Sequence, residues 1–225
     1  MSFESALQAT RDRIQQAEQQ AGRAAGSVQL LAVSKHFPVE AICAVHALGQ
    51  TAFGENYVQE LVSKADALTA LPIEWHFIGP LQSNKTRLVA ERASWVHAID
   101  RLKIAERLSD QRPSTLPDLQ VCIQVNVSGE ASKSGIEPEQ TLEFAQQIAT
   151  LPHLRLRGLM CIPEPIAQSQ TLAAQFAHMQ ALLAQCQAAG LDMDTLSMGM
   201  SADLELAIAH GATYVRVGTG IFGAR

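Results

Sequence analysis

Short apolar runs alternate with longer amphipathic stretches along most of the chain. Residues 3–23 predict a helix, because Phe3, Leu7 and Ile14 fall near one face and polar residues fill the rest. The next segment, 28–35, opens with an almost wholly apolar run, which is typical of a buried strand. Further strands are predicted at 51–55, 73–78, 94–99, 119–127, 154–160, 194–198 and 213–217. The helices predicted between them are 38–48, 57–69, 81–91, 101–110, 138–150, 168–189 and 201–210, and the tail 219–225 starts a last one.

The regular alternation of strand and helix decides the predicted fold. Alternating strands and helices form a parallel sheet, and eight such units in 225 residues fit a closed barrel. A doubly wound open sheet is the alternative, but it usually carries a glycine-rich turn after its first strand, and residues 34–38 contain no glycine. We therefore predict an α/β fold with one domain over residues 1–225, a single (β/α)8 TIM barrel with an extra N-terminal helix.

Composition removes several classes of function. The net charge is −5 and no basic run occurs, which argues against binding to nucleic acid or an anionic membrane. The chain starts without a basic region followed by an apolar core, and no apolar run approaches membrane-spanning length, so we expect a cytoplasmic protein. The histidines never form an H-E-x-x-H pattern, so no metal site is predicted. Free thiols in a reducing compartment are expected at the four cysteines, Cys43, Cys122, Cys161 and Cys186.

Polar residues at the predicted strand ends carry the candidate chemistry, because barrels place their working residues there. Lys35 closes the first strand, and burial of a lysine favours the neutral, nucleophilic amine. The alternative is a lysine whose amine simply reaches solvent.

The last two strands end in residues that predict a phosphate site. Ser201 stands where it would cap the helix 201–210, and Gly218 and Thr219 offer backbone N–H groups after the last strand. An ordinary helix cap and an ordinary glycine turn are the alternative. Because the first and last strands are neighbours in a closed barrel, a ligand with an aldehyde and a phosphate would engage both sites. Pyridoxal 5′-phosphate (PLP) is such a ligand, with Lys35 as its Schiff-base partner and Arg216 as a donor to its ring nitrogen.

Longer motifs carry a family resemblance over nearly the whole chain. They are Ala-Val-Ser-Lys (32–35), Phe-Gly-Glu-Asn-Tyr-Val-Gln-Glu (53–60), Trp-His-Phe-Ile-Gly-Pro-Leu-Gln-Ser-Asn-Lys (75–85), Gly-Leu-Met (158–160), Met-Gly-Met-Ser-Ala-Asp-Leu-Glu (198–205) and Val-Arg-Val-Gly-Thr-Gly-Ile-Phe-Gly (215–223). These motifs resemble the pyridoxal phosphate homeostasis protein family, whose fold is the N-terminal barrel of alanine racemase. The resemblance implies that Lys35 is the Schiff-base lysine and that Arg216 faces the ring nitrogen. It further implies a phosphate site and a pocket lining made by Ser201, Gly218, Thr219, Asn56 and Met160.

The racemase relationship raises the question of catalysis. Racemisation needs two bases, and the racemase takes its second, a tyrosine, from a further domain that we do not expect here. An arginine beside the ring nitrogen disfavours the pyridinium form, which weakens the electron sink. We therefore expect a monomeric, non-catalytic carrier that holds PLP, limits its free concentration and delivers it to apo-enzymes through transient contacts.

Four alternatives to that carrier remain open. They are a slow PLP-dependent amino-acid racemase or lyase, a phosphosugar-processing barrel, a zinc enzyme, which the histidine spacing argues against, and an interaction module. Lys85 and Lys133 are either solvated loop lysines or helpers in transfer or in holding a second ligand.

Overall fold

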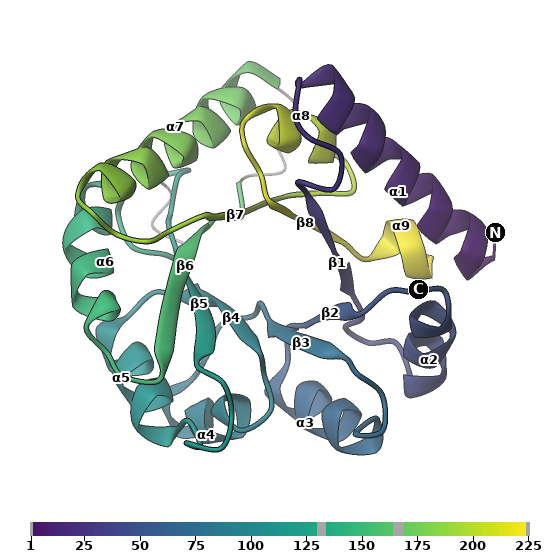
Figure 1. Cartoon of the computed structure of the whole chain (residues 1–225), viewed down its shortest axis with the longest axis horizontal. Helices are drawn as coiled ribbons and strands as arrows, with labels where there is room; N and C mark the ends of the chain where they lie inside the picture. The colour runs from purple at the N-terminus through teal and green to yellow at the C-terminus, as the bar shows by residue number, and fades with distance from the viewer. Residues whose placement is uncertain (1, 130–133, 164–168, 224–225) are drawn as a thin grey trace.

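Eight parallel strands close into a barrel, which confirms the predicted (β/α)8 fold. The computed structural model describes residues 2–129, 134–163 and 169–223. The strands are β1 (Gln29–Val33), β2 (Ala52–Glu55), β3 (Glu74–Phe77), β4 (Trp95–Ile99), β5 (Leu119–Gln124), β6 (Leu154–Met160), β7 (Thr195–Met200) and β8 (Tyr214–Val217). Each strand pairs in parallel with the next, and Ala32 of β1 lies opposite Val217 of β8 to close the ring. Figure 1 looks onto this ring of strands with the helices around it.

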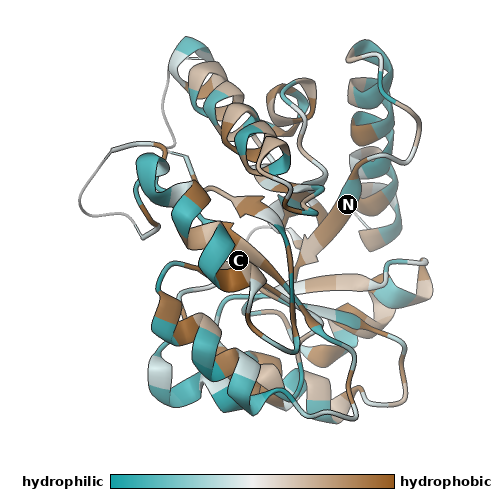
Figure 2. Ribbon diagram, turned by 60° about the vertical axis from the view of Figure 1, so that its left-hand side comes forward, coloured by the Kyte–Doolittle hydropathy of each residue, from teal (hydrophilic) through white to brown (hydrophobic). Residues whose placement is uncertain are grey.

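Helices cover the outside of the barrel, as the amphipathic stretches require. They are α1 (Phe3–Gln20), α2 (Val39–Ala47), α3 (Val58–Ala67), α4 (Thr86–Ala90), α5 (Leu102–Gln111), α6 (Thr141–Ala149), α7 (Ser169–Ala188), α8 (Leu204–Ala209) and α9 (Thr219–Phe222). Short 3₁₀ turns at Ser83–Lys85 and Pro138–Gln140 precede α4 and α6. Figure 2 shows apolar strands at the centre and helices that alternate apolar and polar positions, so the core lies between the two layers.

The extra helix α1 completes the helical ring. The helix after β8, α9, has only four residues and cannot cover its strand pair. In its place α1 packs against α8 and α9, with Leu7 and Ile14 buried and Phe3 edge-on to Phe222 at 5.9 Å. Figure 1 shows α1 beside these two helices. The predicted apolar face of α1 is confirmed.

Several predicted boundaries differ from the structure by a few residues; the helix predicted at 3–23 ends at Gln20 and the strand predicted at 28–35 ends at Val33. The strand predicted at 119–127 leaves the sheet after Gln124, because Val125 and Asn126 pair with the returning segment at Ile136. The helix predicted at 81–91 is helical only from Ser83, and the helix predicted at 201–210 begins at Leu204. Among the described residues, no helix is long and apolar enough to cross a bilayer.

Candidate functional site

A cavity of about 400 Å³ opens at the carboxyl ends of β1, β7 and β8. It is lined by Val33, Lys35, Asn56, Ile78, Ile162, Met200, Ser201, Ala202, Arg216, Gly218 and Thr219. Six of the seven residues predicted from the sequence are in this set, although they come from positions up to 184 residues apart, Lys35 to Thr219. The barrel topology brings them together, because parallel strands end at the same face.

Lys35 lies two residues after the end of β1, lines the cavity and is half-buried. Half-burial removes only part of the water around its amine, so desolvation favours the neutral amine less than complete burial would. The two residues beside it are held firmly: Ser34 is fully buried, and His36 has a φ of 67°, which an ordinary L-residue adopts only under constraint. Within the described residues, the structure records no hydrogen bond or ion pair for the Lys35 amine.

The residues predicted to hold a phosphate line the same cavity as Lys35, and two of them follow β8, the strand that pairs with β1. Gly218 caps the short helix α9, and a side chain at this position would come within 3.2 Å of the Val33 carbonyl oxygen. The close approach of β8 to β1 thus requires a small residue here. Thr219 starts α9, so its backbone N–H has no acceptor within that helix.

The prediction that Ser201 caps a helix is wrong. The cap position of α8 is Asp203, and its Oδ1 accepts a hydrogen bond of 2.5 Å from the Met200 N–H. Ser201 lies in the turn before the helix, where its carbonyl oxygen accepts from Arg13 and its side chain is left to line the cavity. The Asp203 side chain thus closes the turn after β7 and makes no capping hydrogen bond to α8.

Arg216 forms the floor of the cavity and is 5% exposed. Its Nη1 donates to Ser197 O at 2.6 Å and to Ser197 Oγ at 2.8 Å, and its Nη2 donates to Cys161 O at 2.8 Å. Burial lowers the pKa of the Arg216 guanidinium from its usual value. None of these three acceptors is a carboxylate. They orient the Arg216 guanidinium but bring no negative charge to offset its positive charge.

Asn56 and Met160 differ in their relation to the cavity. Asn56 lines it, and its buried Oδ1 has no hydrogen-bond partner among the described residues. Met160 is not among the residues that line it, and its contact with the ligand stays a prediction. The Met160 side chain is fully buried below the cavity, in a cluster with Trp95 and Cys122. Strand alternation explains this: Met160 ends β6 pointing into the barrel rather than over its mouth.

Asn56 also borders a second cleft of about 360 Å³, lined in part by Tyr57, Lys85 and Arg101. Lys85 thus lies beside the main cavity and does not line it. Lys133 falls outside the described residues.

Sequence reasoning missed the apolar rim of the main cavity, Ile162 and Met200, which are 42% and 37% exposed. No polar pattern marks such residues in a sequence.

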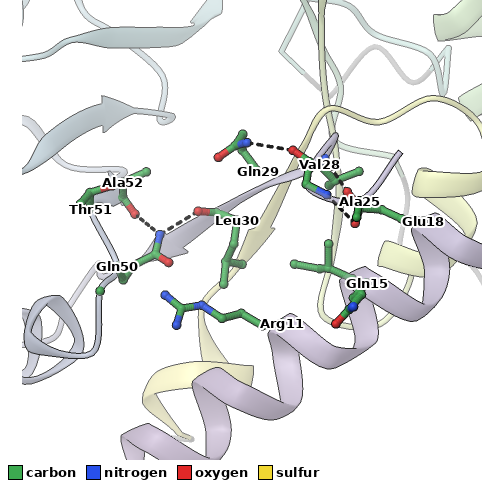
Figure 3. A pocket seen from close by; sticks show the side chains of 13 residues that line it. Arg11, Gln15, Glu18, Ala25, Val28, Gln29, Leu30, Gln50, Thr51 and Ala52 are labelled. Atoms are coloured by element: carbon green, nitrogen blue, oxygen red, sulfur yellow. Dashed lines mark hydrogen bonds between the residues drawn. The ribbon is translucent and has the colours of Figure 1, made fainter. Parts of the chain in front are cut away.

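A hollow of similar volume lies at the opposite end of the barrel, beneath α1. Figure 3 shows that several of its polar side chains form hydrogen bonds with the backbone. Gln50 donates to the carbonyl oxygens of Leu30 and Ala52, and Glu18 accepts from the Val28 N–H. Because these side chains already form hydrogen bonds within the protein, they are not available to a ligand. The cavity at the carboxyl ends of the strands is therefore the better candidate site. Nowhere in the described residues do three potential metal-binding side chains cluster.

Comparison with known proteins agrees with this geometry. The family model described as "Alanine racemase, N-terminal domain" matches residues 6–225. Proteins named pyridoxal phosphate homeostasis protein are 58% identical in Pseudomonas aeruginosa, over 95% of this chain and 91% of that protein, and 51% identical in Escherichia coli K12, over 97% and 95%. The chain belongs to the pyridoxal phosphate homeostasis proteins within the alanine racemase N-terminal domain family.

Two solved structures relate this family to its neighbours. PipY of Synechococcus elongatus, solved with PLP bound, is 37% identical, superposes with a TM-score of 0.86 and covers 99% of this chain and all of its own. Alanine racemase of Corynebacterium glutamicum is 19% identical, with a TM-score of 0.72 over 97% of this chain and 62% of its own. The second likeness is one of fold alone. The resemblance read from the motifs is thus confirmed.

Proposed function

We propose that this chain binds PLP as a Schiff base on Lys35 and acts in intracellular PLP homeostasis. The observation that carries the proposal is one cavity lined both by Lys35 and by Ser201, Gly218 and Thr219. An amine and exposed backbone donors in the same cavity suit a ligand that bears both an aldehyde and a phosphate. The names of the curated relatives and the PLP-bound PipY structure support the same ligand.

The residues of the cavity fit the group in size and in polarity. A volume of about 400 Å³ is within the usual range for small-ligand sites. The unpartnered Oδ1 of Asn56 indicates that a polar group belongs beside it. Arg216 would donate a hydrogen bond to the ring nitrogen, because an arginine has five N–H donors and no acceptor. Bound PLP supplies a reactive aldehyde and an electron-withdrawing ring; the chain supplies the amine, the anion site and the oriented guanidinium.

The arrangement favours a carrier over a racemase. A racemase needs a second base opposite its lysine. Tyr214 lies at the far end of the barrel, where burial raises the pKa of its phenol, and Tyr57 is half exposed in the neighbouring cleft. Neither tyrosine lines the described cavity. Arg216 also disfavours protonation of the ring, and we therefore assign no turnover to the chain.

We further propose that the chain delivers PLP to PLP-dependent apo-enzymes. The exposed apolar rim of Ile162 and Met200 lies at the cavity mouth, where a transient contact would occur. We propose that the chain works as a monomeric, single-domain barrel in the cytoplasm.

The deciding experiment is an absorption spectrum of the purified protein with PLP, beside Lys35→Ala. We expect a yellow imine band in the wild type that borohydride traps on Lys35 and that the variant lacks. Lys85→Ala is the matched control, since this lysine lies in the adjoining cleft, and we expect it to keep the band. A wild-type protein that stays colourless contradicts the proposal and leaves a phosphate-binding barrel.

Incubation with D- or L-alanine and serine separates the carrier from the slow racemase. We expect no exchange of enantiomers above the rate of free PLP. Enantiomer exchange that Lys35→Ala abolishes would establish the racemase instead.

A further inference from the structure

A buried ion cluster lies directly beneath the turn that carries Lys35. Lys64 of α3 is 6% exposed, and its ammonium group donates to Glu55 Oε1 at 2.8 Å and to Glu60 Oε2 at 2.6 Å. Its third hydrogen bond, of 2.9 Å, goes to the carbonyl oxygen of Ser34. An ammonium group has three N–H donors, so all the donors of Lys64 are used.

The cluster holds both neighbours of Lys35. On one side the Ser34 hydroxyl donates to Glu55 Oε1 at 2.6 Å, in addition to the bond from Lys64 to the Ser34 carbonyl. On the other side the His36 N–H donates to Glu60 Oε2 at 2.7 Å, and His36 Nδ1 lies 3.3 Å from Glu60 Oε1. These bonds stabilise the left-handed backbone of His36, which would otherwise be unfavourable.

The same cluster also joins two strands that line the cavity. Glu55 ends β2 and is fully buried, and it is followed at once by Asn56. Because Ser34 directly follows β1 and its hydroxyl donates to Glu55, the carboxyl ends of β1 and β2 are tied together. Burial raises the pKa of Glu55 against the opposing effect of Lys64, while the bonds from Lys64 and His36 outweigh partial burial and lower the pKa of Glu60.

A contrast between two lysines shows what the cluster does. Lys64 has every N–H engaged and no free lone pair, so it cannot act as a nucleophile. The Lys35 amine has no recorded partner among the described residues and lines the cavity. The charged network thus fixes the backbone around Lys35 and leaves its amine unengaged.

We propose that Lys64, Glu55 and Glu60 are positioning residues, which aim the Lys35 amine into the cavity by holding the backbone on both sides of it. The inference rests on the proposed function, since it assigns the aim of the amine to PLP capture. Misplacement of a reacting group by about 1 Å can cost up to about 100-fold in rate. We therefore expect that breaking this cluster slows the capture of PLP by Lys35 even in variants that are fully folded.

The test compares Lys64→Met and Glu60→Gln with a control that breaks another ion pair. Glu60 is a quarter exposed, so Glu60→Gln is the milder variant should Lys64→Met fold poorly. The control is Asp194→Asn, because Asp194 pairs with Arg157 before β7, at the other end of the barrel. All variants are measured at a temperature at which thermal melting shows them fully folded.

The first readout is the rate at which PLP becomes borohydride-trapped on Lys35, followed by peptide mass spectrometry. We expect Lys64→Met to slow trapping by about tenfold or more, Glu60→Gln to slow it less, and Asp194→Asn to leave it unchanged. Trapping in Lys64→Met and Glu60→Gln at the wild-type rate overturns the proposal, and so does equal slowing in the control.

The second readout needs no ligand. The His36 amide bonds to Glu60 and the Phe37 amide bonds to Ser34, so their hydrogen exchange reports on the turn. We expect faster exchange of both amides in Lys64→Met and Glu60→Gln, and unchanged protection in both variants overturns the proposal. If the wild-type Lys35 is never trapped, the proposed function fails by itself, and exchange alone decides whether the cluster holds the turn.

Discussion

Acid should destabilise this protein through two histidines inside the barrel. His76 and His97 are both fully buried, and their rings join at 2.9 Å between His76 Nδ1 and His97 Nε2. His97 Nδ1 lies 2.8 Å from Ser197 Oγ, which in turn accepts from Arg216. The perturbation is a change of pH from about 7.5 to about 5.5, across the usual titration range of an imidazole.

The Glu74 carboxylate favours one direction for the hydrogen bonds in this chain. It lies 3.3 Å from His76 Nε2 and so favours a hydrogen on that nitrogen, which makes His76 Nδ1 the acceptor for His97 Nε2 and His97 Nδ1 the acceptor for the Ser197 hydroxyl. Arg216 donates to the same Ser197 oxygen, which can accept while its own hydrogen points to His97. His97 then carries its hydrogen on Nε2 and donates to His76 Nδ1, and His76 carries its hydrogen on Nε2. That atom lies 3.3 Å from Glu74 Oε1, a contact rather than a well-formed hydrogen bond. Both rings are therefore neutral, with their acceptor nitrogens occupied.

The size of the effect follows from proton linkage. Burial lowers the pKa of His97 well below its usual value, with His76 and Arg216 adding to the effect, and burial lowers the pKa of His76 against the opposing effect of Glu74. A lowered pKa in the folded state means that the unfolded chain binds more protons, so stability is lost as pH falls below about 6.5. One such histidine costs about 1.4 kcal/mol between pH 7.5 and 5.5, and two cost at most about 2.7 kcal/mol.

Urea unfolding at a series of pH values measures this loss directly. We expect His97→Gln to reduce the loss by about 1.4 kcal/mol, whatever its effect on stability at pH 7.5. His178→Gln, in the exposed part of α7, is the control for removing one imidazole. A loss below about 0.5 kcal/mol in the wild type, or an unchanged loss in His97→Gln, would refute the reasoning. Imidazole nitrogen NMR provides a second check, and we expect both rings neutral with hydrogen on Nε2.

Three further predictions concern stability and are checked by urea unfolding at neutral pH. Arg216→Met should lower the free energy of unfolding by about 1–3 kcal/mol, because the buried carbonyl oxygen of Cys161 loses its donor, while that of Ser197 keeps the Cys161 N–H; a change below about 0.5 kcal/mol would contradict the described bonds. Gly158→Ala should lower it by about 3 kcal/mol or more, because the added methyl group would overlap the backbone of Thr195 on β7, and a fully stable variant would disprove this close approach. Glu205→Gln should cost less than about 1 kcal/mol and less still at high salt, because the ion pair with Arg13 is exposed; a larger cost would show that α1 depends on this pair.

The sequence by itself determined the number and order of the elements. Apolar runs of strand length between amphipathic stretches are local properties, and they suffice for eight strand–helix units. They also place Lys35 and Arg216 at strand ends, and a barrel sends all such ends to one face. For this reason six of the seven candidate residues are found around one cavity.

The path of the backbone decided two local details that the sequence left open, the start of α8 and the direction of the Met160 side chain. Ser201 and Asp203 are both residue types that cap helices, and only the path of the turn after β7 places Asp203 at the start of α8 and directs its carboxylate to the Met200 N–H. Likewise Met160 belongs to a motif of the family, and the alternation of β6 places its side chain beside Trp95 and Cys122.

Closure of the barrel decided the remaining polar contacts. His97 meets Ser197 across 100 residues of chain, and Lys64 finds its acceptors on two different strand ends. No spacing in a sequence marks such pairs, because register and closure fix which side chains share the interior. Burial then makes each contact obligatory, since a polar group without water must bond to another part of the protein.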